Sequence, residues 1–190
     1  MKLWQLPIFA FFALASLRAQ EEKSKFDWDP LNIRTSLFSQ DLVMLGSERD
    51  EYASNLAAYA ANEITENNAS IAAINHARRF LALAMHLSPR NKQALVTQFQ
   101  LSKGLLPEKS PGDYSPPVFA RLLLTRGQLL EKQPAGENTL LAHYLIQLAA
   151  EIDPRNEDAV YASEIMRLDQ GPPDWDKLTR PVGKEETSAP

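Results

Sequence analysis

The chain has 190 residues, a formal net charge of −4, no cysteine and only seven glycines. The lack of cysteine excludes disulfides, thiolate nucleophiles and Cys-ligated metal sites. An excess of acid disfavours nucleic acid and anionic membrane surfaces as partners, because both attract basic patches. A hydrophobic content of 44% with 8% aromatic residues favours one domain with a helical core of Leu, Ala and Ile.

The first 19 residues have the pattern of a secretory signal peptide. Lys2 precedes an apolar stretch over 3–17, and Ala19 precedes an abrupt polar run. About 15 apolar residues fall short of the roughly 20 that a membrane span needs, so we expect no integral span in the mature chain. Cleavage is predicted after Ala19, with Ala15 or an uncleaved N-terminal anchor as alternatives. Removal of 1–19 leaves 18 basic and 24 acidic residues, a net charge of −6.

Residues 20–37 show no sustained periodicity and predict an irregular leader with a short docking segment. A helical domain is predicted over 38–171, and apolar residues first recur at steps of three and four from Leu42 to Ile64. Gly46 is expected to divide this stretch into a short first helix and a main helix. The residues at 47–50, "SERD", resemble a capping box that would begin the main helix.

Further helix-boundary signals divide the rest of the domain. "ENNAS" at 66–70 ends one helix and begins another, which Pro89 stops. Helices are then expected at about 91–103, 117–132, 138–152 and 156–168, with Gly104 and Gly171 near two helix ends. The tail, 172–190, is predicted to be irregular. The chain is therefore predicted to be all-α, a short α-solenoid of about six helices arranged in hairpins.

A motif is repeated inside the chain. "HLSPRNKQALV" at 86–96 and "EIDPRNEDAVY" at 151–161 are 65 residues apart. Small and apolar residues recur ahead of each proline, and an asparagine and an alanine follow it. The first copy has Ala77, Leu81, Ala84, Pro89, Asn91 and Ala94, and the second has Ala142, Ile146, Ala149, Pro154, Asn156 and Ala159.

This pattern resembles the tetratricopeptide repeat, in a divergent form. Two standard repeats would be spaced by about 68 residues, so a duplicated three-helix unit is an alternative reading of the same spacing. The resemblance implies a protein-interaction scaffold with a groove. It also implies that the first helix of each pair lines the concave surface.

No constellation of catalytic residues is apparent in the sequence. His76, His86 and His143 are isolated from other metal ligands, so no metal or cofactor is expected, and no nucleophile elbow or phosphate loop is present. Four arginines could bind a carboxylate or a peptide C-terminus: Arg78, Arg79, Arg90 and Arg155. As the alternative, Arg90 and Arg155 could lie on the surface of the turns and bond to helix-end carbonyls. Trp28 and Trp175, each between two acids, are expected to cover the ends of the solenoid, with ligand stacking as the alternative.

The sequence therefore predicts an exported, non-enzymatic module that binds a protein or peptide partner. The alternatives are a membrane-anchored envelope assembly factor and an accessory subunit of an enzyme. Helical faces of mixed polarity suit an extended peptide held by amide side chains. The candidate contact residues are Gln93, Val96, Gln100, Lys103, Tyr59 and Asn62.

Overall fold

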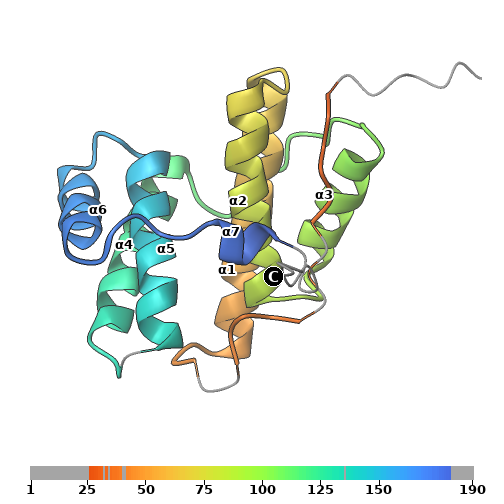
Figure 1. The fold of residues 1–190 in the computed structure, drawn as a ribbon. Coiled ribbons are helices and arrows are strands. Elements are labelled where there is room, and N and C mark those ends of the chain that lie inside the picture. Colours follow the sequence, from red (N-terminus) through yellow and green to blue (C-terminus); the bar gives the residue numbers. More distant parts are fainter. Residues whose placement is uncertain (1–25, 32, 34, 40–41, 135, 181–190) are drawn as a thin grey trace, which may run out of the picture.

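The computed structural model describes residues 26–180 except positions 32, 34, 40, 41 and 135. Within this part of the chain the protein is all-α, with seven helices and no strand. Two helix hairpins lie side by side with one further helix at each end, which forms a short α-solenoid (Figure 1). The predicted fold class is confirmed. The predicted signal peptide and residues 181–190 of the tail lie outside the described residues.

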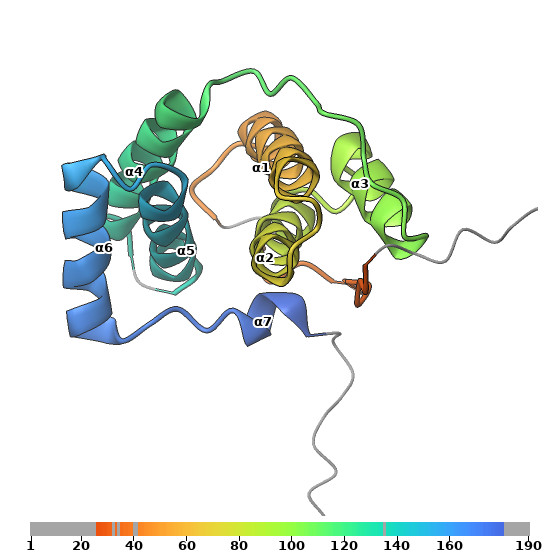
Figure 2. The same cartoon turned by 90° about the horizontal axis from the view of Figure 1, so that it is seen from above.

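The helices form two units of three. Unit 1 contains α1 (Gly46–Glu66), α2 (Ile71–Leu87) and α3 (Lys92–Ser102), and α3 packs mainly on α1. Unit 2 contains α4 (Pro116–Glu131), α5 (Glu137–Ile152) and α6 (Glu157–Gln170), and α6 packs mainly on α5. Seen from above, the elements follow one another as α6, the α4–α5 pair, the α1–α2 pair and α3 (Figure 2). The two single helices therefore lie at opposite ends of the array.

Positions 65 residues apart begin the third helix of each unit, and a glycine follows the end of each. Asn91 and Asn156 cap α3 and α6, since their side-chain oxygens accept hydrogen bonds from the amides of Ala94 and Ala159 at 3.0 and 3.2 Å. After each of these helices a glycine turns the chain through the left-handed region, with φ of 69° at position 104 and 81° at position 171. The spacing found in the sequence thus separates equivalent helices of two units.

Small side chains let the paired helices approach closely. The motif residues preceding each proline are all buried: Ala77, Leu81, Ala84, Ala142, Ile146 and Ala149. Gly127 of α4 lies directly against α5, where an added Cβ would fall 2.5 Å from Cγ1 of Ile146. The close contact within the second hairpin therefore depends on the absence of a side chain at this glycine.

The predicted short helix before Gly46 is not present, and that prediction is wrong. α1 begins at Gly46, and its cap residue Leu45 makes no side-chain hydrogen bond to the helix. The backbone carbonyls ahead of it are bound by the guanidinium of Arg49, which donates to Ser39 at 2.6 Å and to Met44 at 3.3 Å. Because Arg49 satisfies these carbonyls, the segment needs no helical hydrogen bonds.

The tail over 172–190 was predicted to be irregular, but its first part forms a short helix. α7 (Asp176–Thr179) forms one helical turn that packs on α2, with Leu178 fully buried. Trp175 does not cover an end of the solenoid either. Its ring lies between the two hairpins, 4.8 Å from the ring of Tyr144 in α5 and 5.0 Å from the guanidinium carbon of Arg79 in α2. The tail therefore fastens unit 2 to unit 1.

His86 at the end of α2 holds both terminal segments of the described chain. Its Nδ1 accepts a hydrogen bond from the amide of Leu37 at 3.1 Å, so in the neutral ring Nε2 carries the proton and donates to the carbonyl of Leu178 at 3.1 Å. Burial lowers the pKa of His86, against a smaller opposing effect of the Leu178 carbonyl. Both ring nitrogens are thus used by the neutral imidazole.

We expect the protein to lose stability between about pH 7.5 and about pH 5.5. The pKa of His86 is lower in the folded state than the value of about 6.5 for an unfolded chain. The unfolded state therefore takes up more protons as the pH falls, and the free energy of unfolding decreases. Denaturant titrations at both pH values measure the loss. The His86→Asn variant should be less stable than the wild type at the higher pH, and its stability should depend less on pH. Some dependence should remain, because burial also lowers the pKa of His143. Equal pH sensitivity in both proteins would contradict the assignment.

Candidate functional site

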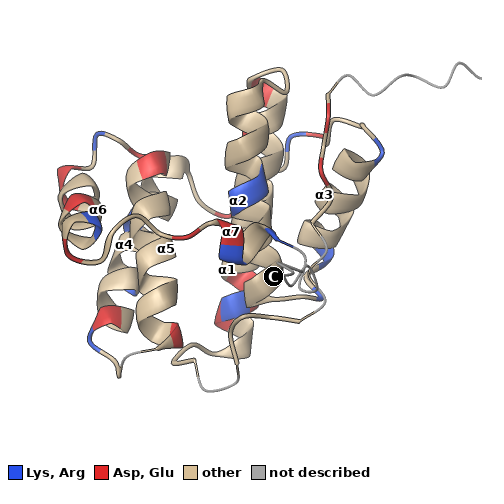
Figure 3. Ribbon diagram, viewed as in Figure 1, with Lys and Arg blue, Asp and Glu red and all other residues tan. Residues whose placement is uncertain are grey.

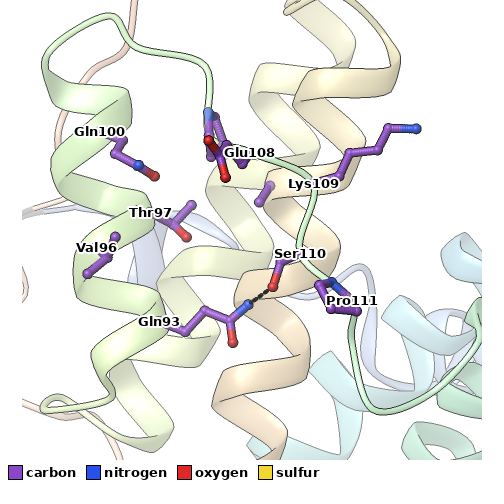
Figure 4. A pocket seen from close by; sticks show the side chains of 10 residues that line it. Gln93, Val96, Thr97, Gln100, Glu108, Lys109, Ser110 and Pro111 are labelled. Carbon is purple, nitrogen blue, oxygen red and sulfur yellow. Dashed lines mark hydrogen bonds between the residues drawn. The ribbon is translucent and has the colours of Figure 1, made fainter.

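An open hollow lies between α3 and the loop that follows it. Its volume is about 260 Å³, and Figure 4 shows the side chains of α3 on one side and the loop on the other. The side chain of Gln93 reaches across the hollow and donates a hydrogen bond to the hydroxyl of Ser110 at 2.7 Å. The residues lining it are Ala61, Gln93, Val96, Thr97, Gln100, Pro107, Glu108, Lys109, Ser110 and Pro111.

A second hollow of about 400 Å³ adjoins the first and shares two of its residues, Gln93 and Val96. Its other lining residues come from the start of α1 and of α3: Asp50, Ser54, Asn91 and Lys92. The two hollows adjoin along α3, with Gln93 and Val96 common to both, and we term them together the α1–α3 groove. Its walls carry both signs of charge, with Asp50 and Glu108 against Lys92 and Lys109.

α1 fixes the loop that forms one wall of the groove. The amide group of Asn62 donates to the carbonyl of Ser110 and accepts from its backbone amide, both at 3.0 Å. Thr65 donates to the carbonyl of Pro107 at 3.0 Å, and Asn55 accepts from the amide of Asp113 at 2.9 Å. These contacts give a proline-rich loop, which cannot form helical hydrogen bonds throughout, one defined path over α1.

Asn91 organises the other end of the groove. Its side-chain amide donates to the carboxylate of Asp50 at 3.0 Å and to the hydroxyl of Ser54 at 2.8 Å. Ser88 donates to the same carboxylate at 2.7 Å. The hydrogen bonds from Asn91 and then Ser88 lower the pKa of Asp50, so this end of the groove carries a negative charge at neutral pH.

The structure brings three of the six candidate residues together in the groove: Gln93, Val96 and Gln100. Asn62 lies behind the wall and holds the loop. Lys103 follows the end of α3 on its outward side, where its ammonium lies 5.7 Å from the centre of the Phe99 ring. Tyr59 is partly buried against Phe80, with ring centres 4.6 Å apart, and burial raises its pKa to about 12.

Sequence reasoning missed the loop wall and the polar cluster around Asp50. Thr97 and Asn91 belong to the motif-bearing helix and its cap, so their place in the repeat could have suggested them. Asp50 and Ser110 lie far apart in the sequence, and only the path of the loop and the packing of α3 on α1 bring both to the groove.

Two of the four arginines that could have bound a carboxylate, Arg78 and Arg79, form ion pairs within the chain, whereas Arg90 and Arg155 are exposed at the turns. Arg79 makes a bidentate ion pair with Glu151, with both N–O distances 3.0 Å, and Arg78 pairs with Asp29 at 2.7 Å. Over the described ranges no three or more His, Asp or Glu side chains are grouped so that they could hold a metal ion. The same residues include no helix with the length and apolar character that a membrane crossing requires.

Comparisons with known proteins give no relative: no family model, no curated protein and no solved structure is significantly similar to this chain. The resemblance to tetratricopeptide repeats thus stays a prediction from the motif residues.

Asn62→Ala is expected to loosen the loop wall, because it removes two hydrogen bonds to Ser110. We expect a loss of about 1–3 kcal/mol in the free energy of unfolding and faster hydrogen exchange at the amide of Ser110. Mass-spectrometric hydrogen exchange of the peptide covering 107–113 measures the effect. Gln128→Ala, at an exposed position of α4, is the matched control and should leave the exchange of this peptide unchanged. Equal exchange in the Asn62 variant and the wild type would show that the asparagine does not fix the loop.

Proposed function

We propose that this protein is a non-enzymatic interaction module whose α1–α3 groove holds an extended segment of a partner protein. The observation that carries the proposal is that the two hollows adjoin along α3 and share Gln93 and Val96. A peptide in extended conformation needs such an elongated site rather than a deep pocket.

The chemistry of the groove supports a peptide as the bound group. Among the described residues the side chain of Gln100 makes no hydrogen bond, and Gln93 uses only its amide hydrogen toward Ser110. Each side-chain amide can donate to a peptide carbonyl and accept from a peptide N–H. Val96, Pro107 and Pro111 add apolar contact surface for alternate side chains of the same segment.

The mixed charges of the groove support a polypeptide over a polyanion. The residues that line the two hollows include two lysines, Lys92 and Lys109, and two acids, Asp50 and Glu108. Nucleic acid binding requires a surface on which basic residues predominate. The net charge of the chain is −4, which also opposes a polyanionic partner.

A pull-down from the envelope and secreted material of the source cell tests the groove. The groove variant Gln93→Ala/Gln100→Ala is compared with the wild type and with Gln128→Ala/Gln170→Ala, which makes the same two changes at exposed positions of α4 and α6. We expect the wild type and the control to recover the same protein, and the groove variant to recover about tenfold less, as loss of two interfacial hydrogen bonds implies. Equal recovery by all three would exclude the groove, and no recovery by the wild type would remove the support for a scaffold.

We also propose that the protein is exported and that its N-terminal segment is removed. The charge, apolar stretch and small residues of 1–19 support this proposal. N-terminal sequencing of the protein from each cell fraction tests it, with an expected start at Gln20, or at Ser16 if cleavage follows Ala15. A start at Met1 in the membrane fraction would contradict export as a processed protein and favour an anchored form.

A further inference from the structure

The single helices at the two ends of the array each have one face without a neighbouring helix among the described residues. α3 exposes Leu95, Val96 and Phe99 by 43%, 47% and 61%, and α6 exposes Tyr161, Ile165 and Leu168 by 70%, 41% and 70%. Scattered apolar residues are normal on a protein surface, but side chains gathered on one helical face form a patch that can bind a protein. These two faces occupy the equivalent helix of each unit.

The outward face of α3 is basic around its apolar centre. Helical spacing places Lys92, Leu95, Phe99 and Lys103 on one side of the helix, opposite the buried Ala94 and Leu101. We term these four residues the α3 ridge. α3 contains no acidic residue, and basic positions mark both of its ends (Figure 3).

The outward face of α6 is acidic around an equally apolar centre. Glu157, Tyr161, Glu164 and Leu168 lie on the side opposite the buried Ala159 and Met166, and we term them the α6 ridge. α6 carries four acidic residues and one arginine, and acidic positions predominate on it in Figure 3. The position equivalent to Lys92 is Glu157, so the duplicated unit has opposite charge at the same place.

We propose that a second copy of this chain docks end to end, with the α3 ridge of one copy against the α6 ridge of the next. Phe99 would pack among Tyr161 and Leu168, and the lysines would face the glutamates. Pairing of two α3 ridges or of two α6 ridges is disfavoured, because like charges would then be opposed. Charge complementarity therefore selects the head-to-tail arrangement.

Contacts inside the chain leave both ridges able to bind. Lys103 lies over the ring of Phe99 from the same helix, and the exposed Glu164 pairs with Arg167 at 2.7 Å. Exposed pairs of this kind contribute little and rearrange readily. A head-to-tail contact uses one α3 and one α6, so each added copy leaves one of each exposed and the assembly can extend.

Charge reversal tests the proposal by sedimentation velocity over a series of concentrations. All proteins are expressed from residue 1, so that every form carries the same N-terminus. The α3 variant is Lys92→Glu/Lys103→Glu, the α6 variant is Glu157→Lys/Glu164→Lys, and a fourfold variant combines them. All four positions are exposed, and circular dichroism confirms that each variant is folded. Because Lys92 also borders the groove, the groove variant Gln93→Ala/Gln100→Ala serves as a control.

The wild type should form a series of oligomers that grow with protein concentration and shrink at high salt. Each reversal variant alone should associate at least about tenfold more weakly. An equimolar mixture of the α3 and α6 variants should regain association and form a series of oligomers, because both the two native ridges and the two reversed ridges then meet with opposite charge. The fourfold variant should associate like the wild type, and so should the groove variant.

Three results would overturn the proposal. A wild type that stays monomeric at all concentrations would show that the ridges do not bind each other. Reversal variants that associate as strongly as the wild type, or a mixture of them that does not regain association, would show that association uses other surfaces. If the groove variant no longer associated, the contact between copies would have to involve the groove. The ridge proposal would then be wrong, while the proposed peptide site would stand.

Discussion

The junction between the two hairpins determines where every other surface of this protein lies. Arg79 of α2 and Glu151 of α5 form the bidentate ion pair across it, and the ring of Trp175 packs on the guanidinium. Both charged side chains are about four-fifths buried, at 20% and 22% exposed, so breaking one partner would leave the other charge poorly solvated. The pair therefore fixes the direction in which the array extends, and with it the separation of α3 from α6.

The two three-helix units share helix signals but present different surfaces. Asn62 in α1 binds the loop that walls the groove, whereas the equivalent position in α4 is Gly127, which lies against Ile146. In unit 1 the side chain at this position binds a loop. In unit 2 the position has no side chain, so α5 can pack closely against α4. One substitution between equivalent positions thus separates a unit with a groove from a unit with a tighter hairpin.

Much of the helical order could be predicted from the sequence because its signals are local. Proline, asparagine and glycine at the turns influence only the backbone of the next few residues. The limits of α2, α3, α5 and α6 are therefore close to those predicted. The segment before Gly46 was predicted wrongly, because the guanidinium of Arg49 satisfies its carbonyls in a way that periodicity does not reveal. Helical spacing was enough to group Gln93, Val96 and Gln100 on one face of α3, and that face lines the groove. The position of Trp175 could not be predicted in this way, because its ring packs against two helices from different units.

The two ends of the described chain meet at one side chain. The guanidinium of Arg78 pairs with Asp29 near the beginning and donates to the carbonyl of Thr179 near the end. Because Asp29 and Thr179 lie close together, a chain shortened to the described residues could be joined there by a short linker and reopened at an exposed turn. The turn between α4 and α5, where Lys132 and Pro134 are exposed, is such a place. Circular permutation there would place the new termini in unit 2, whereas the groove belongs to unit 1.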